Sequence, residues 1–163
     1  MNKIDKALEF TLKWEGGYVN NPLDAGGETK YGIAKRFFPN LDIANLTLED
    51  AKSIYESQYW TRAGCPWMED EDLAIVAFDT AVNCGVGFTV NALKTADTVD
   101  KLLEARKQRY FTIITNNPTQ RAFRKGWSNR VNQLAELVGS SVRWIVEDIK
   151  ADSDKPKVNN NKK

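Results

Sequence analysis

Three side chains near the start of the chain have the types that acid–base chemistry requires. Glu15 precedes a glycine pair, Asp24 follows after eight intervening residues, and Thr29 comes after four more. A protonated glutamate, a carboxylate and a hydroxyl that orients water would form an inverting glycosidase site, and a closer carboxylate pair would form a retaining one. Glu28 is a competing second carboxylate. Asp and Thr are also ordinary turn residues, so Asp24 bonding its own backbone is the alternative.

Composition narrows the chemistry further. The chain of 163 residues contains no histidine, which excludes Ser-His-Asp and Cys-His hydrolases and His-ligated zinc sites. Cys65 and Cys84 offer neither a disulfide framework nor metal-ligand spacing, and we expect both to be reduced, partly buried thiols. Catalysis must therefore rest on carboxylates, Lys, Tyr or hydroxyl groups, and no cofactor or metal is implied.

The helix that must position Glu15 is visible in the periodicity of residues 2–15. At about 100° per residue, the apolar side chains fall on one arc and Glu15 projects into it, between Ile4 and Leu8. Gly16-Gly17 then ends the helix. One interpretation is a structural Glu paired to an Arg. The other is a general acid at a cleft wall, with its pKa raised by desolvation and by the negative end of the helix dipole.

Residues 16–34 follow as an irregular lobe. Val19, Tyr31 and Ile33 favour short strands, and the Asn, Pro and Gly residues between them favour turns. Exposed aromatic side chains commonly stack on sugar rings, and Tyr18, Tyr31 and Tyr59 are the candidates here, with Trp60 behind them. Core packing is an equal alternative for each of them.

The remaining pattern is helical. Thr47 is the expected N-cap of a helix over 48–60, whose predicted core face comprises Leu48, Ala51, Ile54, Tyr55 and Tyr59. An acidic run at 69–72 precedes a buried helix over 73–84 that ends near Gly85. Its polar exceptions, Asp79 and Asn83, are interpreted as core hydrogen-bonding residues rather than catalytic ones.

Two more helical segments follow Asp97, and the second is expected to break at Gly139-Ser140-Ser141. Residues 151–163 are polar and are expected to form a disordered tail. The sequence thus predicts a mainly α fold with a small irregular or β lobe near residues 16–34. We expect one domain over 1–150, with a motif-bearing part at 1–72 and a C-terminal helical part at 73–150.

Charge is divided unevenly along the chain. Residues 1–100 carry 9 basic and 16 acidic side chains, and residues 101–163 carry 14 and 6. A basic C-terminal part suits an anionic partner such as a cell-wall polymer or nucleic acid, and solvated helix faces are the alternative. Zinc-site and RNA-recognition signatures are both missing, so we expect no nucleic-acid partner. No apolar run approaches a membrane span, and the first residues do not have the pattern of a Sec signal.

Four motifs resemble one known family. The stretch "WEGGYVNNPLDAGGETKYGIA" at 14–34 is similar to the glutamate-glycine-glycine-tyrosine motif and following loop of glycoside hydrolase family 108. Later family motifs are resembled by "YESQYW" at 55–60, "AFDTAVNCGVG" at 77–87 and "FRKGWSNRVNQL" at 123–134. The resemblance covers residues 4–138, most of the chain.

The resemblance implies a lysozyme-like N-acetylmuramidase of phages or bacteria. Such an enzyme cleaves the β-1,4 bond between N-acetylmuramic acid and N-acetylglucosamine in peptidoglycan, and Glu15 stands at the family's catalytic glutamate. The order Glu15, Asp24, Thr29 also resembles phage-type lysozymes, in which the second spacing is one residue longer. By family habit the enzyme is a monomeric endolysin, made in the cytoplasm and released to the cell wall through a membrane-pore (holin) partner.

One departure from the family concerns its C-terminal part, which usually carries a Gly-rich insertion between helices. Here "TVNALKTADTVDKLLEARKQRYF" at 89–111 has no such loop, so an autonomous wall-binding function is in doubt. Two rival functions remain open. A lytic transglycosylase also uses a single Glu but leaves an anhydro sugar, and a non-catalytic wall-binding protein would cut nothing.

Overall fold

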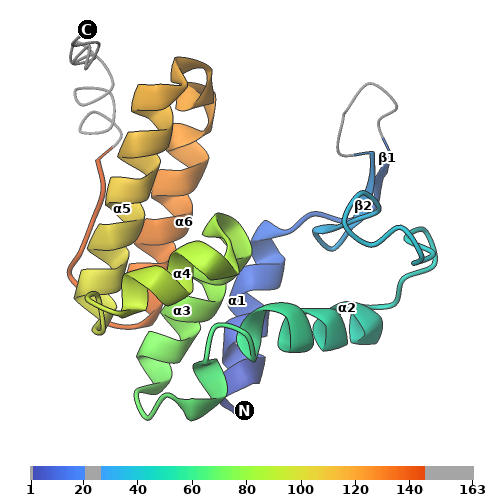
Figure 1. Cartoon of the computed structure of the whole chain (residues 1–163), viewed down its shortest axis with the longest axis horizontal. Helices are drawn as coiled ribbons and strands as arrows, with labels where there is room; N and C mark the ends of the chain where they lie inside the picture. Colours follow the sequence, from blue (N-terminus) through green and yellow to red (C-terminus); the bar gives the residue numbers. More distant parts are fainter. Residues whose placement is uncertain (1, 21–26, 146–163) are drawn as a thin grey trace, which may run out of the picture. The chain divides into compact units, whose positions relative to one another are not determined.

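The computed structural model describes residues 2–20 and 27–145. They fall into two compact units, divided between Asn91 and Ala92. Both units are built from helices, and the first also holds a small antiparallel sheet (Figure 1). The prediction of a mainly α fold with a small β lobe is therefore confirmed. The expectation of a single domain over 1–150 stays a prediction.

Helix α1 (Lys3–Trp14) forms as its amphipathic pattern predicts. The Asn2 side chain caps it by accepting a hydrogen bond from the Asp5 amide, which satisfies one of the free amides of the first turn. Its buried residues are Ala7, Leu8, Phe10 and Thr11. Glu15 follows as the C-cap residue, with extended backbone angles (φ −89°, ψ 125°). The helix thus ends at the predicted catalytic residue.

Helix α3 (Glu71–Cys84) is the core of the first unit. Asp70 caps it by accepting from the Asp72 and Leu73 amides, and the helix is buried without a break from Leu73 to Ala81. Gly85 ends it at φ 98°, a conformation that side chains other than glycine rarely adopt. A separate helix, α4 (Val86–Leu93), comes directly afterwards and was not predicted.

Helices α1 and α3 pack against each other and run in the same direction. Near their starts, Lys6 Nζ lies 2.8 Å from Glu71 Oε1. Further along both helices, the Thr11 hydroxyl donates to Asp79 Oδ1 over 2.8 Å in the buried interior. Later residues of α1 meet later residues of α3, so the C-terminal ends of the two helices lie together.

The sheet has the order β1 (Val19–Asn20), β2 (Glu28–Lys30), β3 (Ile33–Ala34), with antiparallel neighbours. Thr29 lies opposite Val19 on one side and Ala34 on the other, and Lys30 pairs with Ile33. The predicted strands at 19 and 33 are confirmed. Tyr31, predicted to lie in a strand, instead forms the β2–β3 turn with Gly32.

Helix α2 (Leu48–Tyr55) has Thr47 as its N-cap, as predicted. Thr47 and Asp50 form a capping box, in which each side chain accepts from the other's amide. The chain continues as a π-helix, η1 (Glu56–Trp60), and after a turn as a 3-10 helix, η2 (Cys65–Trp67). Ala51 and Tyr55 are buried as expected. The prediction of a core position for Leu48 is wrong, since 41% of it is exposed in the first turn of the helix.

The second unit consists of α5 (Val99–Asn116), a 3-10 helix η3 (Pro118–Phe123) and α6 (Arg124–Leu137). The Tyr110 ring stacks on Trp127 with centroids 4.5 Å apart and meets Trp144 edge-on at 5.1 Å. The predicted break at 139–141 is confirmed, and Gly139 has φ 71° there. Residues 141–145 are not helical. The predicted tail at 151–163 lies outside the described residues.

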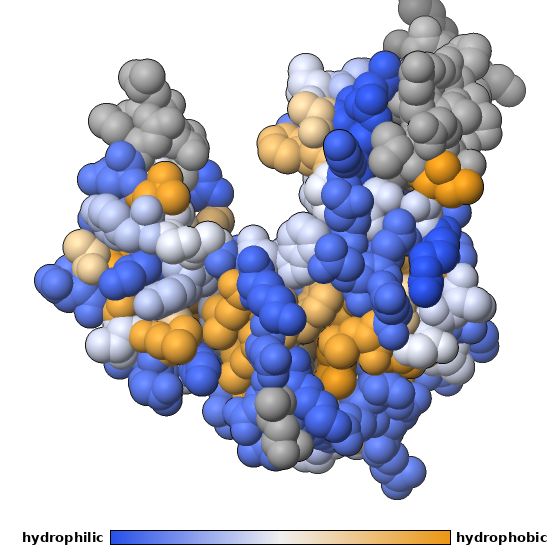
Figure 2. Space-filling view, turned by 180° about the vertical axis from the view of Figure 1, so that it is seen from behind, coloured by the Kyte–Doolittle hydropathy of each residue, from blue (hydrophilic) through white to orange (hydrophobic). Residues whose placement is uncertain are grey.

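The surface around α1 has polar and apolar parts. In Figure 2 its polar outer face forms a hydrophilic stripe with apolar residues on either side. On the α2 side these apolar residues are Leu8, Leu12 and Leu48, which line a shallow hollow between α1 and α2. Within the described ranges, the helices are too short or too polar to cross a membrane.

Candidate active site

Glu15 is held at the end of a helix that is anchored along its length. Lys3 Nζ donates to the carbonyl oxygens of Cys65 (3.2 Å) and Met68 (2.9 Å), which ties the first turn of α1 to η2. The buried bond from Thr11 to Asp79 fixes the helix one turn before Glu15. The Glu15 side chain itself is half-buried. The carboxyl group therefore has a defined position and remains within reach of solvent.

The β2–β3 turn approaches this carboxyl group closely. A Cβ atom at Gly32 would lie only 2.6 Å from Glu15 Oε2 and 2.6 Å from Tyr55 Oη. Such distances are shorter than van der Waals contact, so only glycine fits at this position. Gly32 also has φ 76°, which favours glycine independently. The sequence "YGI" thus brings the backbone of the lobe against the end of α1.

The same turn is held in an uncommon conformation. Tyr31 has φ 51°, which is rare for a large side chain and costs of order 1 kcal/mol or more. Positive φ at both Tyr31 and Gly32 is the pattern of a type I′ hairpin turn. The Tyr55 hydroxyl donates to the Tyr31 carbonyl oxygen over 2.5 Å, so α2 holds the turn in place. Tyr31 thereby contributes its carbonyl group to the site.

Tyr59 lies within the electrostatic reach of Glu15. Burial raises the pKa of the Tyr59 phenol, the negative charge of Glu15 raises it further, and Arg62 lowers it. Its ring lies 5.5 Å from that of Tyr55, one turn earlier. Trp60 is buried against Phe78 of α3, with centroids 5.7 Å apart. Of the two neighbours, Tyr59 is near enough for the Glu15 charge to act on it, whereas Trp60 is part of the core.

Of the other predicted residues, Thr29 and the rival Glu28 lie on β2, and Tyr18 directly precedes β1. Neighbouring side chains of a strand alternate between its faces, so Thr29 and Glu28 project to opposite sides of β2. The Tyr18 hydroxyl donates to Glu28 Oε2 over 2.5 Å, and this bond raises the pKa of Tyr18. Glu28 is thus engaged with Tyr18 at the surface. Asp24 lies outside the described residues, and the roles of all four stay predictions.

Asn83 is a polar residue that the helix packing brings to the same end as Glu15. It lies one turn beyond Asp79 on α3, as Glu15 lies one turn beyond Thr11 on α1. Residues four apart share a helix face, and Thr11 and Asp79 are bonded across the α1–α3 interface. Glu15 and Asn83 therefore both lie one turn beyond this bonded pair, on the facing sides of the two helices. Asp79 is fully buried and hydrogen-bonded, as predicted. Asn83 is half-exposed.

Sequence reasoning missed two contributors. Tyr55 was assigned to the core face, and its ring is indeed 1% exposed, but its hydroxyl group reaches the turn beside Glu15. Gly32 was not singled out. The sequence signal for Gly32 was the Tyr-Gly pair, which forms a two-residue hairpin loop between two short strands.

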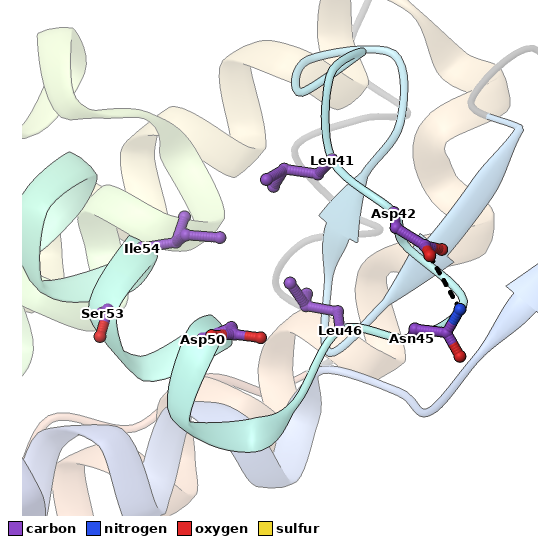
Figure 3. Close-up of a pocket in the computed structure, with 7 residues that line it drawn as sticks. All are labelled: Leu41, Asp42, Asn45, Leu46, Asp50, Ser53 and Ile54. Atoms are coloured by element: carbon purple, nitrogen blue, oxygen red, sulfur yellow. Dashed lines mark hydrogen bonds between the residues drawn. The ribbon is translucent and has the colours of Figure 1, made fainter.

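A hollow of about 430 Å³ lies between the loop of residues 41–46 and α2, with side chains from both converging on it (Figure 3). Three of its polar side chains are engaged with one another or with the backbone, since Asn45 Nδ2 donates to Asp42 Oδ2 and Asp50 completes the capping box. None of the predicted site residues lines it. Across residues 2–20 and 27–145, no cluster of three or more Cys, Asp or Glu is arranged to hold a metal ion.

Comparison with known proteins agrees with the geometry. Residues 8–85 match the family model described as Glycosyl hydrolase 108, and no curated protein matches the chain. Among solved structures, the chain is similar to the structure of Brucella abortus SagA. The TM-score is 0.65 at 20% identity, and 93% of this chain and 96% of that chain are covered. This likeness confirms the predicted lysozyme-like, mainly α fold. The part of the chain that holds the site, residues 8–85, is thus similar to glycosyl hydrolase family 108, which supports a glycoside hydrolase.

Proposed function

We propose that the protein is a peptidoglycan hydrolase of the muramidase kind. Its substrate is the β-1,4 bond between N-acetylmuramic acid and N-acetylglucosamine, and Glu15 is its general acid. The observation that carries the proposal is the placement of Glu15. A half-buried carboxyl group at the end of an anchored helix, with Gly32 and Tyr55 packed against it, suits a group that must deliver a proton in one direction.

The reaction assigned to Glu15 is proton transfer to the glycosidic oxygen. As the bond from the sugar C1 to that oxygen breaks, the leaving sugar takes the Glu15 proton as its hydroxyl hydrogen. The hydroxyl group of a water molecule adds to C1, and the other proton of that water passes to a base. Partial burial supports this role because desolvation favours the neutral, proton-bearing form of a carboxyl group.

The base is proposed to be Asp24, with Thr29 orienting the water, and Glu28 is the rival carboxylate. Asp24→Asn and Glu28→Gln distinguish them. Loss of the base should lower kcat far more than it changes KM, whereas loss of the carboxylate that holds Tyr18 should change KM at most. The anomer that forms first, read by proton NMR, tells whether the reaction inverts or retains.

Tyr59 is the strongest of the proposed sugar contacts. It is half-exposed and lies beside Tyr55 within reach of the Glu15 charge, where a pyranose ring bound for cleavage would pass. Tyr18, 46% exposed, and Tyr31 are proposed to line the lobe side of the same path.

Mass spectrometry of the digested wall tests the reaction. A muramidase releases fragments with a reducing N-acetylmuramic acid end, which gains two hydrogens on borohydride reduction. A lytic transglycosylase would release anhydro ends that are lighter by one water and do not react with borohydride. Failure to release any soluble fragment, with the protein adsorbed to the wall, would instead indicate a non-catalytic wall-binding protein.

A further inference from the structure

The proton of the Tyr55 hydroxyl is already committed. Tyr55 Oη lies 2.5 Å from the Tyr31 carbonyl oxygen. A carbonyl oxygen carries no hydrogen and can only accept, so at this distance the hydrogen between the two atoms must belong to Tyr55. What the Tyr55 oxygen can offer to any other neighbour is a lone pair.

Glu15 is a second close neighbour of the Tyr55 hydroxyl. Glu15 Oε2 and Tyr55 Oη both lie 2.6 Å from the same point, the place of a missing Cβ on Gly32. The two oxygens are thus separated by at most twice that distance. Tyr55 is 1% exposed, so bulk water does not screen its oxygen.

The charge state of Glu15 decides whether this arrangement is favourable. An ionised carboxylate has only lone pairs to offer, and lone pairs facing the Tyr55 oxygen repel each other. A protonated carboxyl group has one O–H, which the Tyr55 oxygen can accept. The energy difference between these two forms of the carboxyl group is larger beside a buried oxygen than it would be in water.

We propose that Tyr55 is a positioning residue that keeps Glu15 protonated, by accepting the carboxyl O–H while its own hydrogen is held by the Tyr31 carbonyl. This inference rests on the proposed function and deepens it by naming how the general acid retains its proton. It also gives a role to the strained Tyr31-Gly32 turn, whose carbonyl oxygen sets the direction of the Tyr55 hydroxyl.

The other ionisable groups around the site are Tyr59, Asp79, Lys30 and Arg62. Tyr59 on η1 is a weak acid whose pKa is raised further by burial, so it is neutral at physiological pH. On α3, Asp79 is buried and accepts from Thr11. Lys30 on β2 directs its ammonium group to the Ala44 carbonyl oxygen. The positive charge of Arg62 lowers the pKa of Tyr59 and so acts against burial there.

The test is a carboxyl titration that does not depend on activity. The full-length protein is labelled with ¹³C at the glutamate side-chain carboxyl, and the Glu15 signal is assigned by its loss in Glu15→Gln. We expect Glu15 to lose its proton at a pH above the ordinary value for glutamate, about 4.3. In Tyr55→Phe the midpoint should fall by about one pH unit, a tenfold change in the proton equilibrium.

Tyr110→Phe is the matched control, since it removes one hydroxyl from a tyrosine that is also 1% exposed, in the second unit. It should leave the Glu15 midpoint unchanged. The inference is overturned if Tyr55→Phe folds and titrates like the parent, or if it only lowers the melting temperature. Should Tyr55→Phe not fold, the parent alone decides: a Glu15 midpoint at or below about 4.3 contradicts the proposal.

Activity measurements keep the two proposals apart. If Glu15→Gln abolishes wall hydrolysis while the Glu15 midpoint is independent of Tyr55, the proposed function stands and the role of Tyr55 is wrong. If Glu15→Gln remains active, the general-acid assignment fails whatever the titration shows.

Discussion

At the scale of single residues, Gly32 is the position where the structure tolerates substitution least. Gly32→Ala would push a methyl group against Glu15 Oε2 and Tyr55 Oη, both only 2.6 Å away. We expect wall hydrolysis to fall at least tenfold, because a displacement of about 1 Å at a catalytic group can cost a hundredfold in rate. The measurement is the initial rate on purified walls, with folding checked by circular dichroism.

Gly27→Ala is the control for backbone strain. Gly27 has a similar φ of 66°, but no atom lies within 4 Å of its Cβ position. The Gly27→Ala variant should lose about as much stability as Gly32→Ala but should hydrolyse walls at the parent rate. Equal loss of rate in both variants would show that the contact with Glu15 is not what the site requires.

The two cysteines should differ in reactivity. Burial raises the pKa of the Cys65 thiol to about 12, and Cys84 is half-exposed. Because the thiolate is the reactive form, Cys65 should not react at pH 8 in the folded protein. Titration with a disulfide reagent should count one fast thiol, and a second only in denaturant. Two fast thiols in the native protein would mean that Cys65 is accessible to the reagent, which its burial contradicts.

At the scale of elements, the bond from Thr11 to Asp79 aligns α1 with α3. Thr11→Val keeps the shape and leaves a buried carboxylate oxygen without this donor. The expected loss is about 1–3 kcal/mol in the free energy of unfolding, measured by urea denaturation. Thr112→Val on α5 is the control, since its hydroxyl donates to the Gln108 carbonyl at the surface. A Thr11 variant as stable as this control would contradict the alignment.

Most helix boundaries could be predicted from the sequence because their signals are local. The cap at Thr47 and the stop at Gly85 depend only on neighbouring residues. Helix α4 was missed because its apolar residues follow Gly85 directly, without a polar capping residue. Leu48 satisfied the helical period but lies in the first turn, at the edge of the packed face.

Only part of the site could be predicted, because only part of it depends on local sequence signals. Glu15 could be identified from one helix and its ending. The approach of Gly32, the hydroxyl of Tyr55 and the place of Asn83 depend on contacts between segments that lie far apart in the sequence, and no local pattern encodes them. Tyr31 was placed in a strand because its side chain favours one, but the turn required positive φ.

At the scale of the whole molecule, charge is divided between the two units. Residues 1–91 carry 8 basic and 14 acidic side chains, and residues 92–163 carry 15 and 8. If the basic unit assists adsorption to an anionic wall, raising the salt from about 0.05 to 0.5 M should lower the adsorbed fraction, because screening shortens the range of these charges. Walls stripped of anionic polymers are the control, and adsorption that ignores salt would contradict this role.

The central claim is that Glu15 donates the proton that breaks the glycosidic bond. Glu15→Gln keeps the shape of the side chain but has no acidic proton to give. The decisive measurement is the rate at which this variant releases reducing ends from purified peptidoglycan, relative to the rate of the parent protein. The melting temperatures of the two proteins are compared to show that the variant is folded. General acid catalysis contributes typically 10²–10⁴-fold, so the rate should fall by at least about a hundredfold. A folded Glu15→Gln protein that releases reducing ends at near the parent rate would contradict the account.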